Sequence, residues 1–132
     1  MYKITLGLLG AIIFIVFMAT LCAFIHNVQG QDTNHKYGLL IFSATWCGPC
    51  QQMHRDVWPV LEKDGSLDGL DVYHIDVDQD RKATKDWRVS SMPTIVLFQY
   101  RDDGSAAEIS RFSAAKSANY VRNWIRQKIP KI

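Results

Sequence analysis

The sequence predicts an α/β domain with a four-stranded mixed sheet flanked by helices, preceded by one N-terminal transmembrane helix. Two observations predict the domain: strand and helix patterns alternate along the chain, and residues 37–44 and 94–100 are apolar on both faces. Strands of that kind are buried between two layers of helices. A third observation predicts the membrane helix, because residues 4–25 form a run of 22 residues without a charge.

The composition is that of one folded domain. The chain has 132 residues, of which 48% are hydrophobic and 21% charged, and this is enough apolar material for a core. The 15 basic and 13 acidic residues nearly cancel, and no basic stripe interleaved with aromatic residues points to nucleic acid. Three cysteines are too few for a disulfide scaffold. They leave one closely spaced pair, Cys47 and Cys50, and an odd thiol at Cys22.

The apolar run at the N-terminus is long enough to span a bilayer. As a helix it would reach ~33 Å at about 1.5 Å per residue, against a hydrocarbon core of about 30 Å. We predict a retained anchor in residues 1–25 over a cleaved signal peptide, whose apolar region is usually shorter, about 7–15 residues. Val28-Gln29-Gly30 keeps cleavage before Gln31 open as the alternative, and the protein would then be secreted.

The charges around this run predict its orientation. Lys3 and the free amino group precede it, whereas residues 26–35 contain no Lys or Arg. Positive charge stays on the cytoplasmic side of a membrane, so we expect a single-pass protein with a cytoplasmic N-terminus. Residues 26–36 predict a polar linker. The domain of residues 37–132 would then lie outside the cytoplasm, in the periplasm or at the cell exterior.

The first half of the domain alternates strands with helices. Residues 37–44 predict a buried strand, and residues 70–77 predict a second strand with partial alternation. Between them, residues 50–63 predict a helix that Pro59 kinks or ends. Residues 80–87 predict a short charged helix. The apolar face of the longer helix consists of Met53, Val57, Val60 and Leu61.

The second half adds a hairpin and a final helix. Residues 94–100 predict a strong strand and residues 106–112 a weaker one, joined by a turn with Asp-Gly at its centre. The order β-α-β-α-β-β-α predicts two βαβ-like units with right-handed crossovers, and an antiparallel hairpin at the sheet edge. Residues 114–128 predict the last helix, with an apolar stripe of Ala118, Val121, Trp124, Ile125 and Ile129.

The motif Trp46-Cys47-Gly48-Pro49-Cys50 falls where a buried strand ends and a helix begins. A helix N-terminus carries partial positive charge and unpaired N–H groups, which stabilise a thiolate, and the thiolate is the species that attacks disulfides. We therefore predict that Cys47 is the exposed nucleophile, with Cys50 one turn later and more buried. Pro49 suits a first helical turn, Gly48 lets another chain approach closely, and Trp46 shields the pair and contacts substrate.

The cysteine pair does not fit a metal site. A structural zinc site needs four ligands, there is no second C-x-x-C, and His54 on the same helix face leaves a fourth ligand missing. The acidic residues Asp76, Asp78 and Asp80 have the spacing that begins a calcium loop, but Arg81 stands where such a loop needs glycine. We interpret them as a solvated loop, and we expect no metal and no cofactor besides the redox-active disulfide.

Two motifs together resemble the thioredoxin family. One is WCGPC within SATWCGPCQQM, and the other is Met92-Pro93-Thr94, whose proline lies 46 residues after Cys47. The resemblance implies a minimal thioredoxin-like fold in which Pro93 has a cis peptide bond and faces the cysteines. It also implies that the Met92 backbone pairs with an extended substrate segment. The activity implied is thiol–disulfide exchange on protein disulfides by Cys47 and Cys50. We predict reduction as its direction, with oxidation as the alternative.

The resemblance also implies partners. These are proteins that carry thiols or disulfides, and an electron donor or acceptor protein, and we expect the protein itself to be a monomer. The alternative function is a thioredoxin-fold binding subunit of a membrane complex, in which redox turnover is incidental.

The sequence departs from the family pattern at several positions. Ile41 stands where thioredoxins usually carry a buried Asp that assists proton transfer at the second cysteine, and His74 aligns with that residue's usual Lys partner. His74 is therefore a candidate proton relay, although a strand histidine with a local hydrogen bond is the simpler interpretation. Ser113 replaces a glycine that helps to line the substrate groove. Only 11 residues separate Ile25 from Tyr37, too few for the first strand and helix of a full thioredoxin, so the fold is expected to be minimal.

Overall fold

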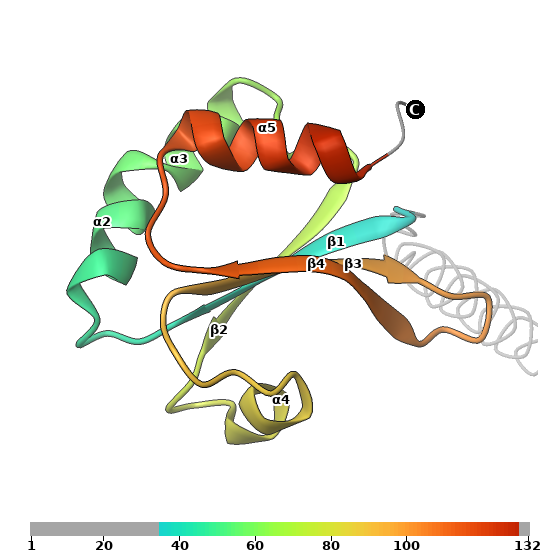
Figure 1. Cartoon of the computed structure of the whole chain (residues 1–132), viewed down its shortest axis with the longest axis horizontal. Coiled ribbons are helices and arrows are strands. Elements are labelled where there is room, and N and C mark those ends of the chain that lie inside the picture. Colours follow the sequence, from blue (N-terminus) through green and yellow to red (C-terminus); the bar gives the residue numbers. More distant parts are fainter. Residues whose placement is uncertain (1–34, 130–132) are drawn as a thin grey trace, which may run out of the picture. The chain divides into compact units, whose positions relative to one another are not determined.

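In this computed structural model the described residues are 35–129. The predicted anchor, the predicted linker up to residue 34, and the predicted absence of a further strand and helix before Tyr37 all lie outside these residues. Within residues 35–129, no helix has the length and apolar character that a membrane crossing requires. The elements of this region surround a single four-stranded sheet (Figure 1).

The sheet is mixed, as predicted. Its strands are β1 (Tyr37–Ser43), β2 (Leu70–Asp76), β3 (Thr94–Tyr100) and β4 (Ala106–Ser113), and their order across the sheet is β2-β1-β3-β4. β1 runs parallel to β2, with Ile41 opposite His74. β3 runs antiparallel to β1, and β4 runs antiparallel to β3. The two central strands are the apolar runs that the sequence marked as buried on both faces.

The second predicted βαβ-like unit is wrong, because β3 does not run parallel to the first two strands. The helix between β2 and β3 is α4 (Arg81–Asp86), which has six residues and rises about 9 Å. A strand of seven residues extends about 23 Å, so α4 alone does not span the sheet, and residues 87–93 do not carry the chain back to the end of the sheet where β2 began. The chain therefore re-enters the sheet at the end where β2 stopped, and β3 runs antiparallel to β1.

The long predicted helix of residues 50–63 is two helices, α2 (Gly48–Asp56) and α3 (Trp58–Lys63). The break falls at Val57, two residues before Pro59. A proline lacks the N–H group that a helix interior needs, and the chain accommodates Pro59 by starting a new helix, in whose first turn a proline is tolerated. Val60, predicted on the apolar face, is 45% exposed.

The last helix, α5 (Ala118–Lys128), begins four residues later than predicted. The side chain of Ser117 caps it by accepting a hydrogen bond from the backbone N–H of Tyr120 at 3.3 Å. Ser117 is a strong N-cap residue, and this signal outweighs the helix-compatible residues before it. The predicted apolar stripe does face the sheet, and Val121, Trp124 and Ile125 are buried.

The sheet has a core on each face. Helices α2, α3 and α5 cover one face and α4 covers the other (Figure 1). Alternate residues of β1 serve the two cores, with Leu39 and Ile41 on the face of α2, α3 and α5, and Leu40 and Phe42 on the face of α4. A strand that is apolar at every position is what this arrangement requires.

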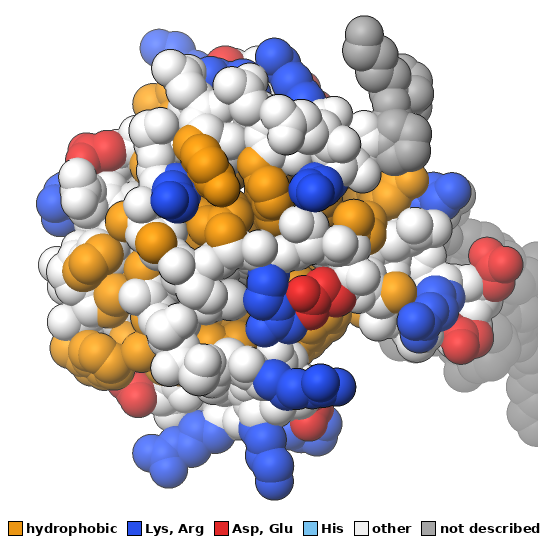
Figure 2. Space-filling view, viewed as in Figure 1, with side chains coloured by type: hydrophobic (Ala, Val, Ile, Leu, Met, Phe, Trp, Pro, Cys, Tyr) orange, Lys and Arg blue, Asp and Glu red, His pale blue; other side chains and the backbone are white. Residues whose placement is uncertain are grey.

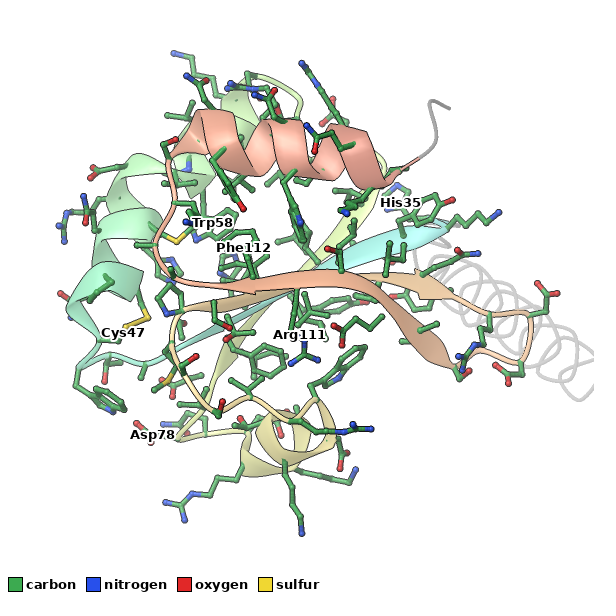
Figure 3. All side chains as sticks on the ribbon, in the orientation of Figure 1. His35, Cys47, Trp58, Asp78, Arg111 and Phe112 are labelled. Atoms are coloured by element: carbon green, nitrogen blue, oxygen red, sulfur yellow. A yellow bond between two sulfur atoms is a disulfide. The ribbon has the colours of Figure 1, made fainter. Side chains whose placement is uncertain are left out.

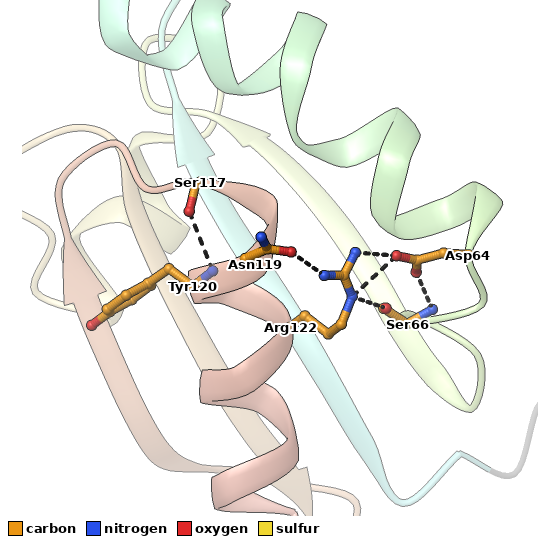
Figure 4. A network of polar contacts seen from close by, with 6 residues as sticks. All are labelled: Asp64, Ser66, Ser117, Asn119, Tyr120 and Arg122. Carbon is orange, nitrogen blue, oxygen red and sulfur yellow. Dashed lines mark hydrogen bonds and ion pairs between the residues drawn. The ribbon is translucent and has the colours of Figure 1, made fainter.

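A polar network fastens α5 to the segment that follows α3 (Figure 4). The Arg122 guanidinium donates to Oδ2 of Asp64 and, through Nε, to Oγ of Ser66 at 3.1 Å. It also donates to the side-chain oxygen of Asn119 one turn earlier. Hydrogen bonds from Ser66 and then from Arg122 lower the pKa of Asp64 below its usual value. The network thereby joins α5 to the end of α3, on the same face of the sheet as α2.

Candidate active site

Cys47 and Cys50 form a disulfide at the N-terminus of α2. Cys47 is the N-cap residue, with an extended backbone (φ −86°, ψ 103°), and Cys50 lies in the first turn. Their Cα atoms are 5.3 Å apart, and the backbone N–H of Cys50 donates to the Cys47 sulfur at 3.3 Å. The predicted place of the pair is confirmed, and the first helical turn directs a hydrogen-bond donor at the sulfur that is expected to attack.

The two cysteines differ in exposure less than the sequence predicted. Cys47 is 7% exposed and Cys50 2%, so the order is confirmed, but the expectation that Cys47 is openly exposed is wrong. The two cysteines form a buried cluster with Ala44, against which Val77 and Met92 pack. Gly48 and Pro49, between the cysteines, are exposed, and a Cβ atom added to Gly48 would have nothing within 4 Å.

Trp46 lies beside the pair and is 65% exposed. Its indole Nε1 donates to Oδ2 of Asp78 at 2.8 Å, and Figure 3 shows Cys47 and Asp78 at the same end of the sheet. Sequence reasoning treated Asp78 as part of a solvated loop and missed this contact. The available signal was topological: Asp78 follows β2 by two residues, and β2 ends at the same edge as its parallel neighbour β1.

The loop before β3 completes the site. The Met92–Pro93 peptide bond is cis, as predicted, and Met92 packs against the cluster of Ala44, Cys47 and Cys50. Thr94 follows, with its side chain bonded to the carbonyl of Ser91 and to the hydroxyl of Ser113. Figure 2 shows hydrophobic side chains at the surface on the side where α2 begins, with few charged side chains among them. A disulfide, a cis-proline loop and an exposed apolar rim therefore lie together.

A sequence profile of the thioredoxin family matches residues 16–127, which is most of the chain. The chain belongs to the thioredoxin family. A thioredoxin of Chlamydia pneumoniae is 33% identical over 90 residues, which are 67% of this chain and 79% of that protein. Thioredoxin H2-2 of Oryza sativa subsp. japonica is 35% identical over 93 residues, or 70% of this chain and 63% of that protein. The matched part thus spans less than two thirds of the rice protein.

Solved structures agree with this assignment. The germline-specific thioredoxin Deadhead of Drosophila melanogaster is 28% identical, with a TM-score of 0.59, over 85% of this chain and 94% of that chain. The four-stranded mixed sheet is thus a thioredoxin-like fold, as predicted. The protein is a thioredoxin-type thiol–disulfide oxidoreductase with Cys47 and Cys50 as its redox pair. Thioredoxins carry out this chemistry with their own disulfide and need no cofactor.

The usual thioredoxin carboxylate is absent beneath this pair. Ile41 stands in its place, 1% exposed within the large core. His74 is opposite Ile41 in the sheet, and its ring lies 5.1 Å from the ring of His54 and 6.2 Å from that of Trp58. His74 is exposed at the surface, but desolvation of its ring lowers the pKa of His74, and repulsion by His54 lowers it further. The ring contacts thus run to α2 and α3, and the proton relay to Cys50 stays a prediction.

Metal ligands do not gather in the described part of the chain. No group of three or more His, Cys, Asp and Glu side chains there could hold a metal ion. Asp80, the last residue of the acidic stretch, caps α4 by accepting from the N–H of Ala83 at 2.9 Å. Asp76 accepts from the N–H of Asp78 at 2.9 Å, so the stretch builds a turn that presents Asp78 to Trp46.

Proposed function

We propose that this protein reduces disulfides of other proteins on the extracytoplasmic side of a membrane, to which residues 4–25 anchor it. The observation that carries the reductase proposal is the Cys47–Cys50 disulfide at the N-terminus of α2, in a buried cluster against which Met92 packs. The location is supported by the uncharged run of residues 4–25 and by Lys3 in front of it. The N-terminus would lie in the cytoplasm.

The reaction follows from the different positions of the two sulfurs. In the reduced protein the Cys47 thiolate, stabilised by the start of α2, attacks one sulfur of the substrate disulfide. That bond breaks, the other substrate sulfur leaves as a thiolate, and Cys47 is joined to the substrate by a mixed disulfide. Cys50 then loses its proton and attacks the Cys47 sulfur, which releases the second substrate thiolate. The substrate gains two electrons and the protein becomes the disulfide form.

Substrate binding uses the surface around the pair. An extended segment that follows a substrate cysteine can pair with the backbone of Met92, in the loop before β3, through main-chain hydrogen bonds like those between strands. Trp46, Gly48 and Pro49 border the same approach and are exposed. The cycle then needs a second protein that carries a dithiol and returns two electrons to the Cys47–Cys50 disulfide. The name thioredoxin, which the relatives share, favours reduction over oxidation.

The experiment that tests this function is disulfide reduction with cysteine variants. Wild-type protein with dithiothreitol as electron donor is expected to reduce insulin, and Cys47→Ser to lose this turnover. Cys50→Ser is expected to accumulate mixed disulfides through Cys47, since the resolving thiol is missing. Mass mapping of the trapped cysteine reads out the roles. If trapping occurs through Cys50 instead, or if wild type turns over no faster than Cys47→Ser, the protein is not such a reductase, and a binding subunit becomes the better explanation.

A further inference from the structure

Thr94 is a buried polar residue directly after the cis-proline loop, and it is 1% exposed. Its hydroxyl has two partners. It lies 2.7 Å from the carbonyl oxygen of Ser91 and 2.8 Å from Oγ of Ser113. The three residues therefore form a short chain of hydrogen bonds, which joins the loop of residues 91–93 to the end of β4.

The number of hydroxyl protons decides which group donates in each of these hydrogen bonds. A carbonyl oxygen can only accept, so the single hydroxyl proton of Thr94 goes to Ser91. Thr94 has no second proton to give, and the bond between Thr94 and Ser113 forms only if Ser113 donates. The hydroxyl proton of Ser113 thus points into the protein. What Ser113 can offer to a visiting molecule is its pair of acceptor sites.

Ser113 is placed to meet such a molecule. It is exposed and sits opposite Thr94 at the end of β4, so it is one strand away from the loop whose Met92 packs on the disulfide. Directly beyond it, a groove runs between α2 and the start of α5, lined by residues that include Met53, Asp56, Ala115 and Lys116. A segment that pairs with the Met92 backbone and continues into this groove passes Ser113.

We propose that Ser113 is a specificity-determining residue, whose Oγ accepts a hydrogen bond from a donor group of the bound substrate segment. The protein would then prefer protein disulfides flanked by a side chain with an N–H or O–H group over those flanked by an apolar side chain. This inference rests on the proposed reductase function. A glycine at position 113, as the resemblance to thioredoxins implies, would offer no such acceptor.

The test compares disulfide-bonded peptides that differ at one residue beside the cysteine, Asn in one and Leu in the other. Asn and Leu have similar size, and only Asn carries N–H donors. The pair is made at each flanking position in turn. At one position, wild type is expected to favour the Asn peptide by about two- to tenfold in kcat/KM, the value of one hydrogen bond. The difference should lie in KM, because binding of the segment does not change during the exchange.

Variants separate the inference from the proposed function. Ser113→Ala should bring the Asn-to-Leu ratio to one at that position, and Ser113→Thr, which keeps the hydroxyl, should retain it. Ser105→Ala is the matched control, because Ser105 lies in the turn at the opposite end of β4, and it should leave the ratio at the wild-type value. Equal ratios in wild type and Ser113→Ala at every position would overturn the inference while leaving the reductase intact. Loss of Cys47-dependent turnover with all peptides would instead refute the proposed function.

Discussion

At the scale of single residues, Trp46 is the side chain best placed to control access to the disulfide. It is the most exposed large apolar side chain of residues 35–129, at 65%, and one hydrogen bond to Asp78 fixes its indole. Since an indole N–H can only donate, a carboxylate is a suitable partner. The hydrogen bond between Trp46 and Asp78 therefore keeps the apolar indole beside Cys47, at the position where a substrate would arrive.

We predict that Asp78→Ala lowers kcat/KM for disulfide reduction by about two- to tenfold, because a single hydrogen bond contributes about 0.5–1.5 kcal/mol. The Trp46 indole would lose its partner and move over more positions. Asp78→Asn keeps an acceptor oxygen and should lose less activity. Insulin reduction measures the rate, and fluorescence anisotropy in a variant with Trp46 as its only tryptophan measures its mobility. Wild-type turnover in Asp78→Ala would show that the bond has no role in substrate approach.

His74 gives the protein a pH dependence with a defined sign. Its pKa is lowered from the usual 6.5, first by desolvation of its ring and then by His54, whereas Glu62 acts in the opposite direction. The unfolded chain therefore binds a proton more readily than the folded protein. Stability contributed by neutral His74 is complete above about pH 6.5, and it is lost as the pH falls through the lowered folded pKa.

We predict that His74→Gln removes this loss. The urea concentrations at the midpoint of unfolding are measured for wild type and variant between about pH 7.5 and pH 5. As the pH falls below about 6.5, the wild-type midpoint should fall more than that of the variant. His54→Gln, which removes the repulsion together with the ring contact, should reduce the wild-type loss in part. Asp64 and Glu108 do not confuse the comparison, because their pKa values are lowered and they titrate below this window. Parallel curves for wild type and His74→Gln would rule out the assignment.

Ile41 predicts how the second half of the reaction depends on pH. Ile41 stands where the resemblance to thioredoxins implies a carboxylate that takes the proton of Cys50, so resolution of the mixed disulfide should be slow near neutral pH and faster as the pH rises. Ile41→Asp would place a carboxylate opposite His74, and we predict that it speeds resolution near pH 7 more than it changes the attack by Cys47. A buried carboxyl destabilises the fold, roughly by 3 kcal/mol, so folding is checked first.

The matched control is Ile41→Asn, which brings a similar polar volume without an ionisable group. Stopped-flow release of substrate from a preformed mixed disulfide on Cys47 measures resolution by itself. If the Asn variant resolves as fast as the Asp variant, or if neither exceeds wild type, the missing carboxylate does not limit this step.

At the scale of elements, the sequence pattern predicted those features that depend on residues close together in the chain. β1 and β3 were found because each contains an unbroken apolar run, LLIF in β1 and IVLF in β3, and the cysteine pair because its spacing matches one helical turn. The direction of β3 was missed because it depends on the length of α4, and the break before Pro59 because the chain resolves a proline by restarting the helix. Asp78 and the link from Ser113 to Thr94 were missed for a similar reason. Strand ends bring these residues together, and no sequence spacing records it.

β1 also contains a position where packing excludes any side chain. A Cβ atom at Gly38 would lie 2.4 Å from Cζ of Phe98 and 2.8 Å from the carbonyl oxygen of Asp71. Phe98 is itself 2% exposed and has little room to move, and a backbone oxygen in a sheet cannot yield without disturbing the ladder. We predict that Gly38→Ala lowers the free energy of unfolding by about 1–3 kcal/mol.

Urea unfolding measures this loss, with Gly48→Ala as the control of the same chemistry. A Cβ at Gly48 has nothing within 4 Å, so that variant should unfold at the wild-type midpoint. If the two alanine variants prove equally stable, the contact at Gly38 is relieved by a shift that costs little.

At the scale of the whole molecule, the chain divides after Thr33, and Asn34–Ile132 form a compact unit. Every strand and helix described lies in this unit, and so do both cysteines and the cis-proline loop. The redox chemistry therefore has its structural basis within this unit. This allows redox activity and location to be tested in one comparison.

We predict that a chain of residues 31–132 melts cooperatively and reduces insulin at the rate of the full chain, but stays in the soluble fraction. The full chain should stay with membranes after alkaline carbonate extraction, because an uncharged run of 22 residues matches a hydrocarbon core of about 30 Å. N-terminal sequencing of the mature protein decides between anchor and signal peptide. Retention of Lys3 supports the anchor, whereas a soluble product that begins at Gln31 would refute it and leave export intact.

Modification of Cys47 by a thiol reagent that does not cross membranes, in intact cells after reduction, should succeed for the full chain. Failure of this labelling, with labelling after lysis as the control, would place the domain in the cytoplasm and contradict the orientation inferred from Lys3.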